Sequence, residues 1–496
     1  MMRFRMMIPG GIVALCGCSG TARTQAPVAG PLVADTTEQI PGAIGTGGSA
    51  YKFASRSIGE TRSVLIGLPK SYAVSTRLYP VIIVLDGEAN FRPAMTVVGE
   101  LSSLGHVPES IVIGIPNTNR LRDLTPPGIS VSGSSKSEGG DRFLDFVEKE
   151  LMPALKTQFR ANGMVVLVGH SSGGLIVTYA AATRPAFRLI LSLDSPTHLD
   201  DSWIVKKMVE ATKNQSLSRL RYVSLESRFG YNDSSWARVK NAAPPTWILE
   251  REKLDNETHV SLPFFGMYVG LRDMFADYAT NRAPQSPTSS TLAYYHDLEK
   301  LYGGPLIPPA GLLRQVIEDF EMEGQSRRAH EGWHLLVDSY GMPKDSADWQ
   351  QRLAKLEKMP PLTETVESIL ATPRATAVAA KDFLGEWRGQ QWINEEDKND
   401  VVLRLRDSAG VVVGEMTNLP EPGEMPPMRI QYLKVVGGGV EWGYMNGMRP
   451  RGMLIYKAAL KNGIMTGAMD FGGIRFVPPA GMPGPPTVRF ELRKVK

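Results

Sequence analysis

One strand–turn–helix stretch, residues 164–182, limits most strongly what this chain can fold into. Met164 to Val168 are large or β-branched apolar residues, which predicts a short buried strand. Leu175 to Ala182 predicts a helix, and the G-x-S-x-G pattern Gly169-His170-Ser171-Ser172-Gly173 lies between the two. A buried strand that passes through a sharp turn into a helix is the setting in which this pattern forms a nucleophile elbow.

A steric argument explains why the two outer positions of this pattern are glycines. Side chains at positions 169 and 173 would collide with the neighbouring strand and helix, while Ser171 has to adopt a strained backbone conformation. The N-terminus of the following helix directs free N–H groups to the same point. Glycine makes up 49 of the 496 residues, so the pattern alone is also compatible with a turn without chemistry. The strand before it and the helix after it favour Ser171 as a nucleophile.

Residues 1–18 have the features of a bacterial signal peptide. Arg3 and Arg5 precede ten apolar or small residues, too few for a helix that crosses a bilayer. The stretch ends in Leu15-Cys16-Gly17-Cys18, which resembles the lipobox of bacterial lipoproteins and implies acylation of Cys18. An ordinary signal peptide that contains cysteines is the alternative. We therefore expect a lipid-anchored protein on the periplasmic side of a bacterial cell envelope, with residues 19–48 as a flexible tether.

Composition removes several classes of function. The only two cysteines are Cys16 and Cys18, so the rest of the chain has neither a disulfide framework nor a thiol nucleophile. The formal net charge is +4, and no basic run is interleaved with aromatic residues, which argues against a nucleic-acid partner. No apolar stretch reaches the roughly 18 residues that a membrane-spanning helix needs.

Apolar runs and helical periodicity alternate over residues 49–280. Besides the elbow strand, five segments predict strands: residues 62–69, 79–86, 110–116, 188–194 and 220–226. Residues 141–157 have apolar side chains at helical spacing, and further helical segments accompany the later strands. This alternation predicts an α/β domain in which helices cover both faces of a mainly parallel sheet.

A serine hydroxyl becomes nucleophilic only when a base takes its proton and an acid orients that base. In α/β-hydrolases the order along the chain is serine, acid, histidine, and His259 is the histidine that follows the last predicted strand. The acid should lie between them, and the two candidates are Glu226 and Asp233. We favour Glu226, because a strand end is held more rigidly than a loop interior.

Two backbone N–H groups should stabilise the oxyanion that forms on the attacked carbonyl. We predict that they belong to Ser172, directly after the nucleophile, and to Glu88, in the loop after the strand at 79–86. Three side chains that follow strand ends are candidate substrate contacts, namely Asn117, Arg122 and His198. For Asn117 and Arg122, bracing of their own loop is the alternative.

These stretches together resemble the putative esterase family of α/β-hydrolases, which includes esterase D-type enzymes, feruloyl esterases, mycolyltransferases and the enterochelin and trilactone siderophore esterases. The resemblance rests on the elbow and on residues 79–91, 112–126, 139–143, 257–261 and 270–272. It implies serine-dependent cleavage of carboxylic esters and supports Ser171 and His259. It supports an acid only weakly, since some siderophore-esterase-like members work with a Ser–His dyad. Ser172 departs from the family, which often has an apolar residue there.

Residues 291–370 predict a helical extension, after a breaker-rich linker at 281–290. The extension contains His330-Glu331-Gly332-Trp333-His334, a literal H-E-x-x-H, in which histidines one helical turn apart bind zinc and the glutamate is the base of a peptidase. Gly332 lowers the helix propensity inside the motif, and nothing around it predicts the rest of a peptidase domain. We favour surface or packing histidines, with a zinc peptidase as the alternative.

Residues 381–496 have a strand-rich composition. Strands are predicted at 401–406, 411–413, 428–436, 453–458, 464–469 and 488–493, with hairpin turns at Asn462-Gly463 and Ser408-Ala409-Gly410. We expect an all-β module that closes into a barrel or sandwich. Gly385-Glu386-Trp387 resembles the G-x-W opening of calycin-type barrels, and a packed interior is the default for a small barrel.

The sequence thus predicts acyl transfer from a small-molecule ester through Ser171, His259 and Glu226, with no cofactor and no metal. The alternatives are the zinc peptidase and a non-catalytic envelope binding protein on an α/β-hydrolase scaffold.

Overall fold

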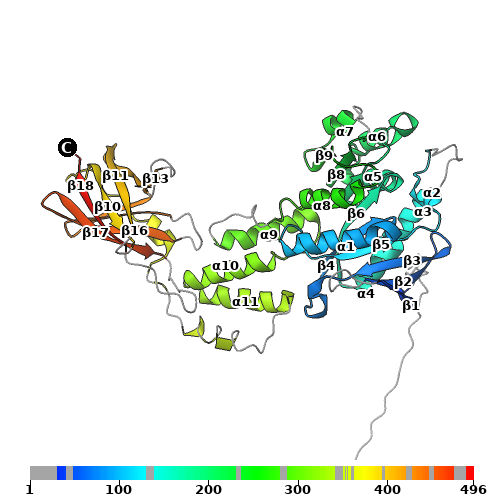
Figure 1. The fold of residues 1–496 in the computed structure, drawn as a ribbon, viewed down its shortest axis with the longest axis horizontal. Coiled ribbons are helices and arrows are strands. Elements are labelled where there is room, and N and C mark those ends of the chain that lie inside the picture. Colours follow the sequence, from blue (N-terminus) through cyan, green and yellow to red (C-terminus); the bar gives the residue numbers. More distant parts are fainter. Residues whose placement is uncertain are drawn as a thin grey trace, which may run out of the picture.

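The computed structural model describes residues 31–40, 48–129, 139–230, 236–279, 288–340, 350–351, 354, 356–358, 362, 364–393, 397–419, 427–445, 452–473 and 488–495 (Figure 1). The predicted signal peptide, Cys18 and most of the predicted tether lie outside these residues, and so does Asp233. Within the described part of the chain, no helix combines the length and apolar character needed to cross a membrane.

A nine-stranded sheet organises residues 33–254, in the order β1-β2-β3-β5-β4-β6-β7-β8-β9. The strands are β1 (Val33–Ile40), β2 (Gly48–Ser55), β3 (Glu60–Gly67), β4 (Tyr79–Leu85), β5 (Ile111–Ile115), β6 (Ala161–His170), β7 (Leu189–Leu193), β8 (Leu220–Ser227) and β9 (Trp247–Leu254). The first three are antiparallel, and β5, β4, β6, β7, β8 and β9 run parallel. The predicted α/β fold with a mainly parallel sheet is confirmed.

Three strands of this sheet were not predicted, and all lie toward its edges. β1 falls in the segment predicted to be a tether, so that prediction is wrong for residues 33–40. β9 carries the charged run Glu250-Arg251-Glu252-Lys253, which hides it from a search for apolar strands. β2 is likewise only partly buried. β1 and β9 are the edge strands, and an edge strand needs fewer apolar residues than a central one because one side of it has no neighbour.

Helices cover both faces of the sheet. One face packs against α3 (Gly139–Asp145), a π-helical turn (Phe146–Leu151), α4 (Met152–Gln158), α5 (Ser172–Thr183), α6 (Leu199–Ala211) and α7 (Trp236–Ala242). The other face packs against α1 (Gly87–Ser103) and α8 (Leu262–Met274). Short elements complete this part: α2 (Arg120–Leu124) and 3-10 turns at Lys70–Ala73 and Gln215–Leu217.

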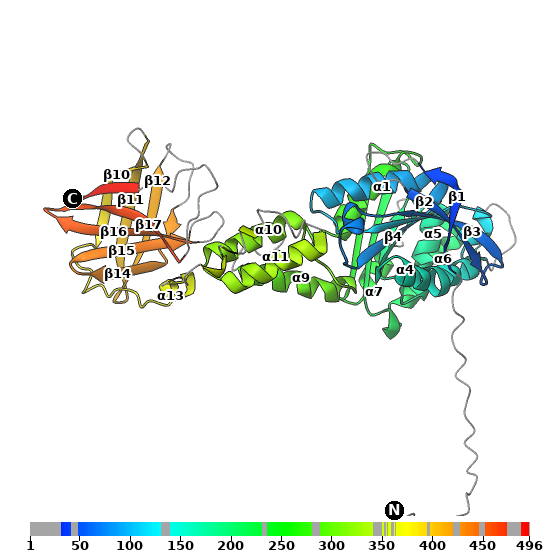
Figure 2. The same ribbon diagram turned by 90° about the horizontal axis from the view of Figure 1, so that it is seen from below.

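The helical extension shares a core with the second face of the sheet. It contains α9 (Thr288–Tyr302), α10 (Ala310–Met322), α11 (Ser326–Tyr340) and the short α13 (Val366–Leu370). Apolar residues of α9, α10 and α11 belong to the same buried cluster as α1, α8 and one face of β4, β6 and β7. Figure 2 shows these three helices between the α/β domain and the C-terminal module.

The C-terminal module is an antiparallel sheet in the order β13-β12-β11-β10-β18-β17-β16-β15-β14. Its strands are β10 (Gly385–Trp392), β11 (Lys398–Ser408), β12 (Val411–Leu419), β13 (Met428–Arg429), β14 (Tyr432–Val436), β15 (Gly439–Met445), β16 (Met453–Lys461), β17 (Ile464–Gly472) and β18 (Val488–Lys494). β10 and β15 are additional to the strands predicted.

One short stretch closes this sheet. β13 pairs with β12, whereas β14, only two residues later, pairs with β15 at the far end of the strand order. The N–H of Ile430 donates to the Gly414 carbonyl at 2.9 Å, and the N–H of Gln431 donates to the Gly443 carbonyl at 2.8 Å. The stretch therefore joins the two ends of the sheet, and the module is a barrel with a packed interior.

Candidate functional site

Ser171 occupies the turn between β6 and α5 in a strained conformation. Its φ is 56° and its ψ is −120°, which a residue with a side chain adopts only when its surroundings enforce it. A Cβ at Gly169 would lie 2.1 Å from the Gly173 carbonyl oxygen, so glycine alone fits there. The N–H of Ser171 donates to the Leu193 carbonyl at 2.9 Å and ties the turn to the end of β7. This is the backbone geometry of a nucleophile elbow.

Two helix N-termini meet beside this turn. β4 and β6 are parallel neighbours, with Val84 opposite Val168, and each leads directly into a helix. α5 begins at Ser172 and α1 begins at Gly87, followed by Glu88. The first N–H groups of a helix have no acceptor within the helix. The backbone N–H groups of Ser172 and Glu88 therefore lie at the same sheet edge, and their role as oxyanion donors stays a prediction.

His259 is hydrogen-bonded to a carboxylate, and that carboxylate is Asp194. The His259 Nδ1 atom lies 2.7 Å from Asp194 Oδ2, and half of the imidazole side chain is exposed. Asp194 follows β7 directly and is buried. Ser227 fixes it further, because its N–H donates to Oδ1 at 3.1 Å and its hydroxyl donates to Oδ2 at 2.8 Å. The pair has the arrangement of a general base and its orienting acid.

Glu226 does not take the place predicted for it. It lies within β8, opposite Lys253 of β9, and its carboxylate is ion-paired with Arg251. The strand ends one residue later, so the pleat directs Glu226 to a face of the sheet rather than to its edge. The carboxylate at His259 therefore comes from the end of β7 and not from β8.

The elbow contributes a second imidazole. The ring of His170 lies against that of His259, with 4.4 Å between centroids and an angle of 42°. The pKa of His170 is lowered to about 4, chiefly by burial and then by the nearby charge of His259, against smaller opposing effects of Asp194, Asp86 and the His259 backbone. His170 is thus neutral at neutral pH. Its Nε2 atom is buried and has no hydrogen-bond partner among the described residues.

A polar network lies on the other side of the elbow. Asp86 follows β4 with a φ of 53° and is bound by Arg120, from Nε to Oδ1 at 2.6 Å and from Nη2 to Oδ2 at 3.0 Å. Arg120 Nη2 also reaches the His170 carbonyl at 3.4 Å. Asn117 Nδ2 donates to Asp86 Oδ1 at 2.6 Å and to Glu88 Oε1 at 2.7 Å. Asn117 therefore braces this network.

The arginine that reaches the elbow is Arg120, whereas sequence reasoning selected Arg122. Arg122 is held by Glu60 at 2.8 Å and by Asp123 at 2.6 Å, which is the bracing role considered as its alternative. These contacts lower the pKa of Glu60 to about 2, chiefly through the hydrogen bond from Arg122. His198 is exposed at the N-terminal end of α6, so its contact with substrate stays a prediction.

The H-E-x-x-H motif lies in α11, away from these groups in the chain. The rings of His330 and His334 are 4.7 Å apart, but Glu331 is paired with Arg327. Within the described residues, the one group of three metal-capable side chains consists of His170, Asp194 and His259. The described part of the chain thus offers no third ligand to the motif.

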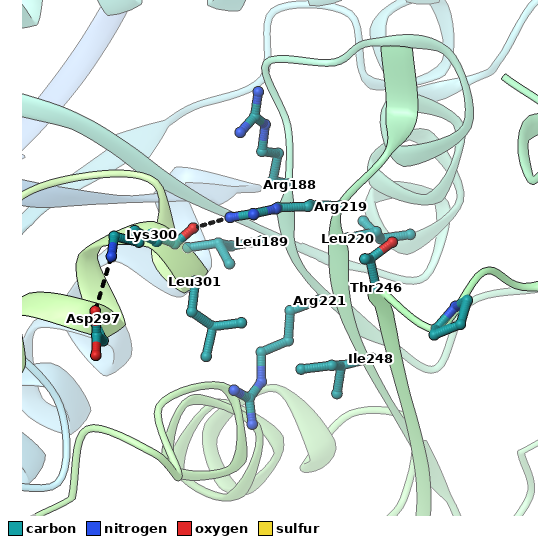
Figure 3. A pocket seen from close by; sticks show the side chains of 11 residues that line it. Arg188, Leu189, Arg219, Leu220, Arg221, Thr246, Ile248, Asp297, Lys300 and Leu301 are labelled. Atoms are coloured by element: carbon teal, nitrogen blue, oxygen red, sulfur yellow. Dashed lines mark hydrogen bonds and ion pairs between the residues drawn. The ribbon is translucent and has the colours of Figure 1, made fainter. Parts of the chain in front are cut away.

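A crevice of about 360 Å³ lies at the opposite edge of the sheet, where α9 ends against the first residues of β7, β8 and β9 (Figure 3). Its charged groups hold segments together. Arg219 donates to the Lys300 carbonyl, Lys300 pairs with Asp297, and Arg221 pairs with Asp277. We interpret it as part of the junction between sheet and extension.

The residues of this site lie in the segment of the chain that matches a known protein family. Residues 55–261 match the model of the family described as Putative esterase. This segment contains Ser171, Asp194 and His259, and ends two residues after the histidine.

Two curated proteins are similar over shorter stretches. A siderophore triacetylfusarinine C esterase of Aspergillus fumigatus is 32% identical over 118 residues, which are 21% of this chain and 40% of the relative. The uncharacterized protein YbbA of Bacillus subtilis is 28% identical over 134 residues, or 25% of this chain and 52% of the relative. The chain thus spans about half the length of the curated relatives it matches.

Among solved structures, an IroE-like serine hydrolase from Shewanella oneidensis is 29% identical. The match covers 58% of this chain and 96% of that one, with a TM-score of 0.48.

Proposed function

Because residues 55–261 match the model of the putative esterase family, we propose that this chain is a serine esterase that cleaves small-molecule carboxylic esters by acyl transfer. The observation that carries the proposal is the 2.7 Å contact between His259 and Asp194 beside a serine in elbow conformation. A base oriented by a buried carboxylate is what a serine hydroxyl needs in order to attack an ester.

The proposed reaction gives each of these groups a role in acylation. His259 takes the proton of Ser171 while its Nδ1–H is donated to Asp194, whose negative charge stabilises the imidazolium. Ser171 attacks the ester carbonyl, and the N–H groups of Ser172 and Glu88 bind the oxyanion. His259 then protonates the leaving alcohol. In the second half, water deprotonated by His259 releases the acyl group from Ser171.

The surroundings of the site support an ester with one polar and one apolar side. Arg120, whose side chain is 42% exposed, offers donors on the α1 side of the elbow. On the other side, the loop after Ser227 exposes Phe229 and the loop that carries His259 exposes Val260, at 70% and 87%. The N–H of Arg228 donates to the Glu257 carbonyl and so links these two loops. The Aspergillus relative is named as an esterase of the siderophore triacetylfusarinine C. We therefore propose siderophore esters as the substrate class of this chain.

We further propose that the chain is a lipoprotein of the cell envelope, anchored through acylated Cys18. The support is the lipobox-like sequence at residues 15–18. Cys18→Ala should release the protein from membranes, detected by fractionation, and retention of the variant in the membrane fraction would contradict the anchor.

The esterase proposal is tested by initial rates on a series of aryl esters and on an iron-free siderophore triester. Wild type should hydrolyse them in the presence of a chelator, and Ser171→Ala should not. A peptidase that used His330, Glu331 and His334 would show the reverse pattern, with loss of activity in the chelator and no effect of the serine substitution. A non-catalytic binding protein would hydrolyse none of the esters.

A further inference from the structure

The structure assigns a further property to this site: we propose that His170, Asp194 and His259 bind Zn²⁺ and that this inhibits the esterase. This rests on the proposed function in the sense that inhibition requires a reaction to inhibit. Binding of the metal does not require one.

The donor set is the first argument. One ligand atom from each of the three residues lies within 4.8 Å of the other two. Two imidazoles and a carboxylate are ligands that Zn²⁺ prefers, at about 2.0–2.2 Å each, which puts neighbouring ligand atoms about 3.4 Å apart. No pair therefore has to close by more than about 1.4 Å. His259 can contribute to this movement, because half of its side chain is exposed.

His170 is the second argument. The ester reaction assigns it no proton and no substrate, yet its buried Nε2 has no partner among the described residues. Its ring lies against that of His259 and close to Asp194. Asp86, whose charge also acts on His170, is already paired with Arg120. A neutral imidazole that lies beside a base–acid pair and has a ring nitrogen without a hydrogen-bond partner has the chemistry of a metal ligand.

A Zn²⁺ ion bound by these residues prevents His259 from acting as the base, whichever of its two ring nitrogens binds the metal. If Nε2 binds zinc, the lone pair that should take the Ser171 proton is occupied. If Nδ1 binds zinc, the hydrogen bond to Asp194 is lost. Mg²⁺ should not inhibit, because it prefers oxygen ligands.

The experiment titrates Zn²⁺ into wild type and variants and expresses every rate relative to the same protein without metal. Wild type should be inhibited, reversed by chelator. His170→Phe should need at least about tenfold more Zn²⁺ for half-inhibition. The matched control, His330→Ala with His334→Ala, should be inhibited like wild type. If the Phe ring disturbs the elbow, His170→Asn gives the same comparison.

Binding is measured separately with Ser171→Ala protein, which has no nucleophile, by competition with a chromophoric chelator. One Zn²⁺ per chain should bind. The additional substitution His170→Phe should weaken this binding by the same factor by which it raises the Zn²⁺ concentration for half-inhibition. Equal inhibition of wild type and His170→Phe, no inhibition of wild type by zinc, or binding that disappears with the His330 and His334 substitutions would overturn the proposal. If wild type hydrolyses no ester but Ser171→Ala binds zinc through His170, the proposed function fails and the metal site stands.

Discussion

The two sheets of this chain put their residues to different uses. In the first sheet six neighbouring strands run parallel, so the ends of β4, β6 and β7 and the starts of α1 and α5 meet at one edge. In the barrel neighbouring strands are antiparallel, and the interior is filled by aromatic rings such as Trp442 and Tyr456, stacked at 5.4 Å. A parallel sheet gathers polar groups at an edge, whereas this barrel uses its side chains for packing. Substitutions at that edge should therefore change catalysis, and substitutions in the barrel should change stability.

The largest expected effect is that of Ser171→Ala. Removal of the nucleophile should lower kcat by roughly 10⁶-fold, because no other group can form the acyl intermediate. Stopped and continuous ester assays measure the loss, and circular dichroism checks that the fold is kept. If the variant kept more than a small fraction of wild-type activity, the claim that catalysis depends on the edge of the first sheet would be wrong.

The next largest effect distinguishes the two candidate acids, Asp194 after β7 and Glu226 near the end of β8. Asp194→Asn should lower kcat by about 10⁴-fold, because the amide favours the wrong tautomer of His259. Glu226→Gln is the matched control, and it should change kcat/KM by less than about threefold, since Glu226 pairs with Arg251 on the sheet face. The reverse order of the two effects would return the acid role to Glu226.

A substitution in the barrel should act on stability alone. Trp442→Ala removes a fully buried ring that contacts Tyr456 and Phe490, and should cost about 3–5 kcal/mol of the barrel's unfolding free energy. Val411→Ala, at a 40% exposed position, is the control. Calorimetry follows the unfolding transitions. Loss of ester hydrolysis in Trp442→Ala at a temperature where the barrel is folded would show that the two sheets are coupled.

The smallest expected effect is on acid stability. The pKa of His170 is about 4 in the folded chain against an ordinary 6.5, so the unfolded chain binds the proton first. The α/β domain should lose stability as the pH falls from 6.5 to 4, with no further loss from this group below that. Residues 381–496 contain no histidine, so the barrel should lack this contribution. Across this pH range, the unfolding midpoint of His170→Phe should change less with pH than that of wild type. An equal pH dependence in the two proteins would contradict the assignment.

Much of the catalytic edge could be predicted from the sequence. The elbow motif identified Ser171, and the position after the last strand identified His259, because local pattern and chain order fix both. The acid could not be identified in this way. Asp194 is a carboxylate at a strand end between serine and histidine, as Glu226 was thought to be. Only the spatial order β6-β7-β8 shows that the end of β7 lies directly beside the elbow.

The missed strands have a similar explanation. β9 and β2 lie toward sheet edges and have mixed polar sequences, so their pairing comes from their neighbours rather than from an apolar pattern. The choice between barrel and sandwich also needed the structure, because it depends on the two hydrogen bonds of Ile430 and Gln431. Arg120 and Arg122 are two residues apart, and sequence alone does not say which faces the elbow.

The most direct test of the central claim is labelling with a fluorophosphonate, followed by peptide mass spectrometry. The account predicts one covalent adduct, on Ser171, which forms much more slowly in His259→Ala and Asp194→Asn and is absent in Ser171→Ala. An unlabelled wild-type protein, or an adduct on another residue, would contradict it.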